Sequence, residues 1–147
     1  MPENPPLDVT SRLELAIDLA RRAGELLRSG YGHAGAVRYK GPIDPVTEYD
    51  LRSEALIRDG LSAAFPEDSV LGEEGGSSGD GHGRWLVDPL VGTVNFAHAI
   101  PIFAVSMAYA MGDRVVLGVT YDPMRDELFH ATAGGGAWLN GDRLRVS

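Results

Sequence analysis

The sequence predicts an α+β fold in which two helices pack on a largely antiparallel sheet. Apolar residues recur with a helical period in the first 65 residues, whereas short apolar stretches separated by glycine-containing turns dominate after residue 85. Because the helices come first and the strands follow, this order favours helices gathered on one face of a meandering sheet. The 147 residues are enough for one domain with a hydrophobic core.

The first helix is expected over residues 11–29. Ser11 can cap its start and Gly30 can end it. Residues 1–10 carry no apolar periodicity and are expected to form a flexible arm. The buried face of the helix is predicted from apolar residues at helical spacing: Leu13, Ile17, Ala20, Gly24 and Leu27.

A second helix is expected to begin near Thr47 and to end at Phe65-Pro66. Thr47 and Asp50 have the spacing of a capping box, although glutamate or glutamine is the commoner partner at the second position. The residue before a proline is disfavoured in a helix, which explains the predicted end. Glycine and proline between residues 30 and 45 predict a turn or an irregular hairpin. One buried face is expected from Ile57, Leu61 and Ala64.

The rest of the chain is expected to form strands. "SVLGEEGG" reads as a short strand that runs into a glycine turn, and "SSGDGHG" reads as a loop. From Trp85 onward, Gly112-Asp113 separates two apolar stretches as a hairpin turn would. Asn140-Gly141 has the composition of a tight turn between the last two strands.

Composition excludes several classes of function. The 13 basic and 21 acidic residues give a net charge of −8, which disfavours nucleic acid as a partner. No apolar run approaches the roughly 20 residues that span a bilayer, and the first residues do not resemble a secretion signal, so no membrane partner and a cytoplasmic location are expected. There is no cysteine, which excludes disulfides and zinc-thiolate sites. The glycine-rich stretches do not fit a G-x-G-x-x-G nucleotide turn.

Four acidic residues fall at the ends of expected elements: Asp44, Asp50, Glu73 and Asp88. Glu73 and Asp88 each close a short apolar stretch and are followed closely by glycine or proline. Two carboxylates at the ends of adjacent strands would repel each other unless a cation joined them. Mg²⁺ favours such carboxylates together with water and phosphate oxygens.

Gly92 and Thr93 follow Asp88 and open a stretch that reads as a short helix. Backbone N–H groups at the start of a helix bind anions well, and a threonine hydroxyl can orient a water. An Asp before a proline is also a common turn former, and Gly-Thr is also a common helix start. Taken together, however, these features predict a metal-assisted phosphate site.

Three blocks resemble the N-terminal part of the inositol monophosphatase family, among the Mg²⁺-dependent, lithium-sensitive sugar phosphatases. They are "DPVTEYD", "LGEEGG" and "WLVDPLVGTVNFAHAIPIFAVSMA", and the closing "GGGAWLNGDRLRVS" is also similar to a family pattern. The resemblance covers nearly everything from Ser11 onward. It implies that residues 11–147 form the family's N-terminal α+β domain, without its C-terminal α/β domain.

The resemblance implies a role for matching residues in "LGEEGG" and in the stretch after Trp85. Glu73 and Asp88 would hold Mg²⁺ together with the backbone carbonyl of Leu90. Glu73 and Thr93 would activate the attacking water. The N–H groups of Gly92 and Thr93 would bind the phosphate next to Asp88.

Two further acids are implied to support this site. Asp50 would hydrogen-bond Thr93, and Asp44 would line the site. The implied reaction is attack of a metal-activated water on a small phosphate monoester. We expect inositol monophosphate as the substrate; histidinol phosphate, fructose bisphosphate and 3′-phosphoadenosine compounds are the alternatives. Members of the family pair as homodimers, so a homodimer is expected.

Val91 departs from the family pattern, which has an aspartate of the second metal site at this position. Valine offers no side-chain oxygen to a cation. The chain also ends at Ser147, before the family's further metal-binding aspartate. We therefore expect at most one tightly bound Mg²⁺ and slow turnover. The alternative is a catalytically inactive chain that acts by self-association.

Overall fold

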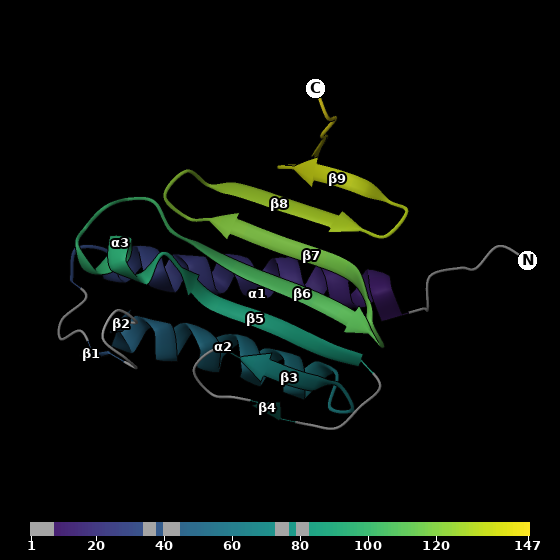
Figure 1. Cartoon of the computed structure of the whole chain (residues 1–147), viewed down its shortest axis with the longest axis horizontal. Helices are drawn as coiled ribbons and strands as arrows, with labels where there is room; N and C mark the ends of the chain where they lie inside the picture. The colour runs from purple at the N-terminus through teal and green to yellow at the C-terminus, as the bar shows by residue number, and fades with distance from the viewer. Residues whose placement is uncertain (1–7, 34–37, 40–44, 73–76, 79–82) are drawn as a thin grey trace, which may run out of the picture.

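The computed structural model describes residues 8–33, 38–39, 45–72, 77–78 and 83–147 of the chain. Within these ranges it contains two long helices and an extended sheet (Figure 1). Asp44 and Glu73 lie outside the described residues, as do residues 1–7 of the expected arm.

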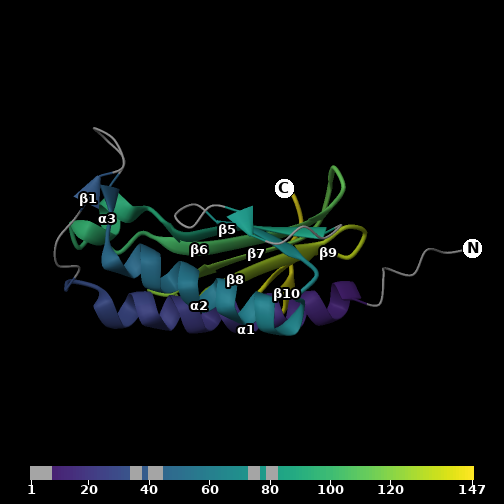
Figure 2. The same ribbon diagram turned by 90° about the horizontal axis from the view of Figure 1, so that it is seen from below.

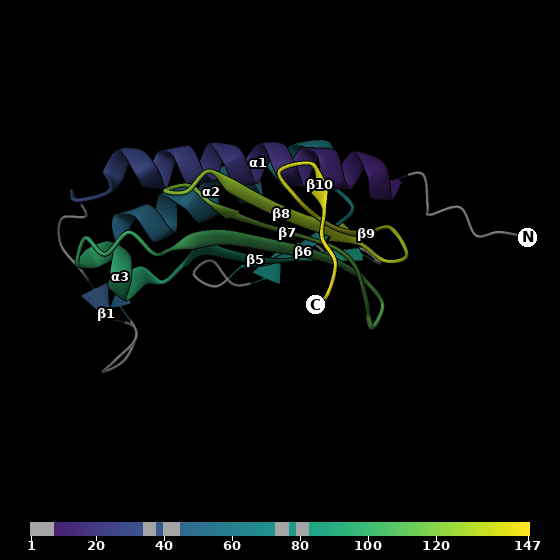
Figure 3. The same cartoon turned by 90° about the horizontal axis from the view of Figure 1, so that it is seen from above.

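Helices α1 (Asp8–Gly30) and α2 (Glu48–Ala64) lie side by side on one face of the sheet (Figures 2 and 3). The capping box predicted for α2 is confirmed, with Thr47 as the N-cap and Phe65 as the C-cap. The predicted start of α1 is wrong. Residues 8–10 are helical rather than part of a flexible arm, so Ser11 is not the cap, and Val9 is already buried.

The predicted largely antiparallel sheet is confirmed. Its eight strands follow the order β10-β9-β8-β7-β6-β5-β3-β4, and among the described pairings only β3 with β5 is parallel. A separate two-stranded ribbon joins β1 (Arg38–Tyr39) to β2 (Pro45–Val46). The strands of the large sheet are β3 (Ser69–Gly72), β4 (Ser77–Ser78), β5 (Gly83–Val91), β6 (Ala104–Met111), β7 (Arg114–Asp122), β8 (Glu127–Thr132), β9 (Gly136–Leu139) and β10 (Asp142–Arg143).

Both predicted tight turns are confirmed. Met111 at the end of β6 pairs directly with Arg114 at the start of β7. Gly112 and Asp113 are therefore the two residues of the turn between these strands. Asn140 and Gly141 connect β9 to β10 with φ angles of 50° and 86°. Positive φ at both central residues is the hairpin geometry that an Asn-Gly pair favours.

Side chains alternate between the two faces of the sheet, so one face is apolar and packs on the helices. Trp85 and Val87 of β5 are buried on this side, as are Val105 and Met107 of β6. From the helices, Leu19, Leu27, Ile57 and Leu61 complete the core, whereas Ala64 is exposed, contrary to the expectation. Asp88 lies on the other face, in register with Ser106 of β6 and Thr120 of β7.

A buried ion pair joins α1 to the start of the sheet. The Arg12 guanidinium donates to both oxygens of Asp68, at 2.7 and 2.9 Å, and both residues are almost fully buried. Trp85 and Tyr109 also donate to this carboxylate, at 3.1 and 3.2 Å. The Arg12 guanidinium also lies 4.0 Å from the centroid of the Phe65 ring. The pair therefore fixes α1 and the turn after α2 to β5 and β6.

Replacing Asp68 with asparagine removes the negative charge that the buried Arg12 guanidinium faces. We expect Asp68→Asn to lower the free energy of unfolding by about 3–5 kcal/mol, the usual cost of breaking a buried ion pair. The control is Asp18→Asn, which breaks the exposed Arg22–Asp18 pair and should cost less than about 1 kcal/mol. Urea denaturation measures both variants, and equal losses would contradict the structural role of the buried pair.

Candidate functional site

Strand β5 ends in a β-bulge at the sequence Asp88-Pro89-Leu90-Val91. Asp88 pairs with Ser106 of β6, and Val91 pairs with Ala104, so two residues on β5 oppose one on β6. Such a bulge redirects the side chains that follow it. Neither Pro89 nor Leu90 has a register partner on β6.

The bulge places the side chains of Asp88 and Val91 on the same face of the sheet. Their partners Ser106 and Ala104 are two residues apart on β6, and such residues share a face. Asp88 is half-buried, and Val91 is 41% exposed. A cavity of about 460 Å³ adjoins Asp88 and is lined by residues of β3, β5 and β6. Position 91 therefore contributes apolar surface to the face of the sheet that carries the Asp88 carboxylate.

Gly92 turns the chain from β5 into the short helix α3 (Thr93–Ala97), as the sequence predicts. Its φ angle of 91° lies in the left-handed region. A Cβ atom at this position would also lie 3.0 Å from the carbonyl oxygen of Ile102. Both constraints favour glycine, and the Phe96 amide donates to the Gly92 carbonyl at 3.0 Å to form the first helical turn.

The Thr93 hydroxyl is fixed by Asp50, which comes from the first turn of α2. Thr93 Oγ1 donates to Asp50 Oδ2 at 2.8 Å, and Thr93 Oγ1 also lies 3.2 Å from the Leu90 carbonyl oxygen. Asp50 Oδ1 accepts from the amide and the hydroxyl of Thr47, at 2.8 and 2.6 Å. Because the single hydrogen of the Thr93 hydroxyl is directed to Asp50, its lone pairs can accept a hydrogen bond from water.

Asp88 lies one residue beyond the point where β3 ends, in the part of β5 that continues without β3 as a neighbour. β3 runs parallel to β5, and its last residue, Gly72, pairs with Val87. The next residues along the two strands are Glu73 and Asp88, of which only Asp88 is described. Asp88 Oδ1 accepts from the Leu90 amide at 3.3 Å. Among the described residues, no group of three or more histidine, aspartate or glutamate side chains could hold a metal ion.

Sequence reasoning missed Ser53, which also connects α2 to this turn. Its hydroxyl donates to the Pro89 carbonyl at 2.7 Å, and the side chain has no exposed surface. Ser53 lies three residues after Asp50, so both project from one side of the helix. That spacing was visible in the sequence, but its partner on β5 depends on the tertiary structure.

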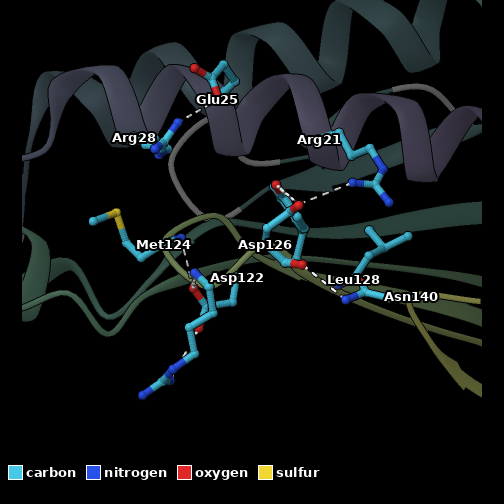
Figure 4. A network of polar contacts seen from close by, with 10 residues as sticks. Arg21, Glu25, Arg28, Asp122, Met124, Asp126, Leu128 and Asn140 are labelled. Carbon is cyan, nitrogen blue, oxygen red and sulfur yellow. Dashed lines mark hydrogen bonds and ion pairs between the residues drawn. The ribbon is translucent and has the colours of Figure 1, made fainter. Parts of the chain in front are cut away.

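A second polar cluster lies at the turn between β7 and β8 (Figure 4). Asp126 accepts from the Tyr121 hydroxyl at 2.8 Å, and its carboxylate lies 3.5 Å from Arg21. Burial, followed by this hydrogen bond, raises the pKa of Tyr121 to about 12. Asp122 is paired with Arg125. Arginines therefore face the acids of this cluster, whereas Asp50 accepts its hydrogen bonds from neutral groups.

Replacing Thr93 with valine removes the hydroxyl that donates to Asp50 Oδ2. Since Asp50 is buried, we expect Thr93→Val to lower the free energy of unfolding by about 1–3 kcal/mol, the cost of a buried acceptor that loses its donor. Thr93→Ser keeps the hydroxyl and should lose much less. Thermal denaturation compares the two, and an equal loss would show that the hydrogen bond is not the cause.

The profile of the inositol monophosphatase family matches residues 8–147. Inositol monophosphatase 2 of Solanum lycopersicum is 40% identical over 141 residues, covering 92% of this chain and 53% of the relative. Histidinol-phosphatase of Chlorobaculum parvum is also 40% identical, covering 95% of this chain and 54% of the relative. The crystal structure of extragenic suppressor protein suhB from Bartonella henselae superposes with a TM-score of 0.90 at 42% identity, covering 93% of this chain and 55% of that one.

These comparisons extend over only part of each relative. The chain spans about half the length of the curated relatives it matches. Within the part of the chain that the structure describes, no helix is both long enough and apolar enough to cross a membrane.

Proposed function

The chain belongs to the inositol monophosphatase family, and we propose that it supplies the catalytic N-terminal half of a Mg²⁺-dependent phosphatase. The observation that carries this proposal is the hydrogen bond from Thr93 to Asp50, next to the turn that holds Asp88. We propose a small phosphate monoester as substrate, with inositol monophosphate first. Histidinol phosphate is the best-supported alternative, because one relative is a histidinol-phosphatase.

The oxygen atoms that Asp88 and Leu90 present at the β5 bulge are suitable ligands for a hard divalent cation. Asp88 offers carboxylate oxygens, and Leu90, which lies in the bulge, offers a carbonyl oxygen 3.2 Å from the Thr93 hydroxyl. Oxygen donors of these two kinds are those that Mg²⁺ prefers. We propose that Glu73, which lies outside the described residues, completes this set. Bound there, Mg²⁺ would lower the pKa of a water molecule and polarise the phosphate.

The residues around this set have separate tasks in the proposed reaction. Because Thr93 donates its hydrogen to Asp50, its oxygen accepts a hydrogen bond from the attacking water and orients that water. Glu73 is proposed to accept the proton that the water loses. The N–H groups of Gly92 and Thr93, at the start of α3, would donate to the phosphate oxygens.

Val91 limits the proposed site to one tightly bound ion. It faces the same side as Asp88, so an aspartate at this position would add a second carboxylate beside the first. Valine leaves only apolar surface there. A second ion would find only one carboxylate ligand in this region, that of Asp88. One carboxylate is a poor ligand set for Mg²⁺. We therefore propose slow turnover for this chain.

The alternative is a chain that acts by self-association, as the homodimers of the family suggest. Four large apolar side chains are exposed on or beside α3, and a cluster of this kind is a feature of protein interfaces. They are Val91, Val94, Ile100 and Ile102, each between 41% and 53% exposed. Light scattering at increasing concentration tests this alternative, and a chain that stays monomeric would exclude it.

Phosphate release from inositol monophosphate, histidinol phosphate, fructose bisphosphate and a 3′-phosphoadenosine compound tests the proposed function. We expect slow, Mg²⁺-dependent release that falls at least about tenfold in Asp88→Asn, because losing a ligand weakens the metal site. The control is Asp126→Asn, which changes an acid in the other polar cluster and should keep the activity. Release that does not need Mg²⁺, or that survives in Asp88→Asn, would refute the proposal.

Introducing an aspartate at position 91 places two carboxylates on one face of the turn. We expect Val91→Asp to lower the metal-free stability by up to about 1 kcal/mol, because like charges repel. The same change should raise Mg²⁺ affinity by about tenfold, or roughly 1.4 kcal/mol. Calorimetry measures both effects. Val91→Asn, which adds no charge, is the control, and a gain in metal-free stability by the aspartate would contradict the expectation.

A further inference from the structure

Ser53 is a buried hydroxyl that the proposed reaction leaves without a task. It lies on α2 with no exposed surface, and its hydroxyl donates to the Pro89 carbonyl at 2.7 Å. This bond crosses from the helix to the bulge at the end of β5. It is the second contact of its kind, because Asp50 reaches Thr93 from the same side of α2.

The bulge explains why Pro89 needs a donor from outside the sheet. Pro89 has no partner on β6 in the strand register and is itself buried. Buried carbonyl groups are almost always hydrogen-bonded, and an unsatisfied one costs free energy. The Ser53 hydroxyl supplies a hydrogen bond to this carbonyl, at a residue that lies outside the β5–β6 register.

The same peptide group links Ser53 to the Asp88 carboxylate. The carbonyl of Pro89 and the N–H of Leu90 belong to one planar trans peptide, in which they point in opposite directions. Ser53 donates to the carbonyl on one side, and the N–H on the other side donates to Asp88 Oδ1 at 3.3 Å. The direction of the first hydrogen bond therefore fixes the direction of the second.

We propose that Ser53 is a positioning residue that orients the Asp88 carboxylate and the Leu90 backbone for a divalent cation. This role rests on the proposed function, because that function makes Asp88 and Leu90 metal ligands. Asp50 anchors one end of the turn through Thr93, and Ser53 anchors the other end through Pro89. Helix α2 thereby sets the geometry of a site to which Ser53 contributes no ligand.

Mn²⁺ binding to the whole chain, followed by electron paramagnetic resonance, tests this role. We expect Ser53→Ala to weaken Mn²⁺ affinity roughly tenfold, the scale found when residues that orient metal ligands are changed. Ser53→Thr keeps the hydroxyl and should restore most of the affinity. The matched control is Ser69→Ala, which removes a hydroxyl 3.4 Å from the Gly83 carbonyl at the far end of β5. The control should bind Mn²⁺ within about twofold of the unaltered chain.

A metal-free readout accompanies the titration. Hydrogen exchange of the Leu90 amide should accelerate at least about tenfold in Ser53→Ala, because the peptide group loses its anchor, and should stay unchanged in Ser69→Ala. A general loss of stability would instead raise exchange along the whole of β5.

The outcomes separate this inference from the proposed function. If the unaltered chain binds no Mn²⁺, or if Asp88→Asn binds it equally well, the proposed function fails and the role of Ser53 fails with it. If Asp88→Asn abolishes binding while Ser53→Ala binds Mn²⁺ as tightly as Ser69→Ala, only the role of Ser53 is overturned. A selective loss in Ser53→Ala together with faster Leu90 exchange supports it.

Discussion

The two hydrogen bonds from helix α2 to the end of strand β5 are the constraint on which the candidate site depends. Asp50 is the acid of the capping box, and its second oxygen accepts from Thr93. The acid that caps the first turn of α2 therefore also fixes the Thr93 hydroxyl. Ser53 adds a bond one turn later, where the bulge leaves Pro89 outside the register. A rigid helix thus holds an irregular turn, and irregular segments are held this way at many functional sites.

The opposite end of β5 explains why α2 can serve as a support. There the Arg12–Asp68 pair, with Trp85 and Tyr109, joins α1 to the sheet and to the turn after α2. Both helices are consequently fixed to the strands at one end, while the site occupies the other end. The register of β5 with β6 then decides which side chains face outward with Asp88, and through the bulge it includes Val91 among them. The apolar side chain at position 91 therefore lies on the face of the candidate site rather than in the core.

Local patterns in the sequence were sufficient for much of this structure. The capping box at Thr47, the Asn140-Gly141 turn and the glycine before α3 depend on residues close together in the chain, and all three are present. The early start of α1 was missed because Val9 gains its burial from tertiary packing. The bulge at the end of β5 and the contact of Ser53 depend on register and on residues far apart in sequence. The roles of Glu73 and Asp44 stay predictions.

Paramagnetic broadening by Mn²⁺ in a ¹⁵N-resolved NMR spectrum tests most directly whether a divalent ion binds where α2 meets the end of β5. The account predicts that substoichiometric Mn²⁺ first broadens the amide signals of residues 88–93, with Asp50 next. Signals of the polar cluster at the β7–β8 turn, around Asp122 and Asp126, should stay sharp because arginines already face those acids. Broadening that begins at the β7–β8 turn, or that spreads evenly over the acidic surface, would contradict the account.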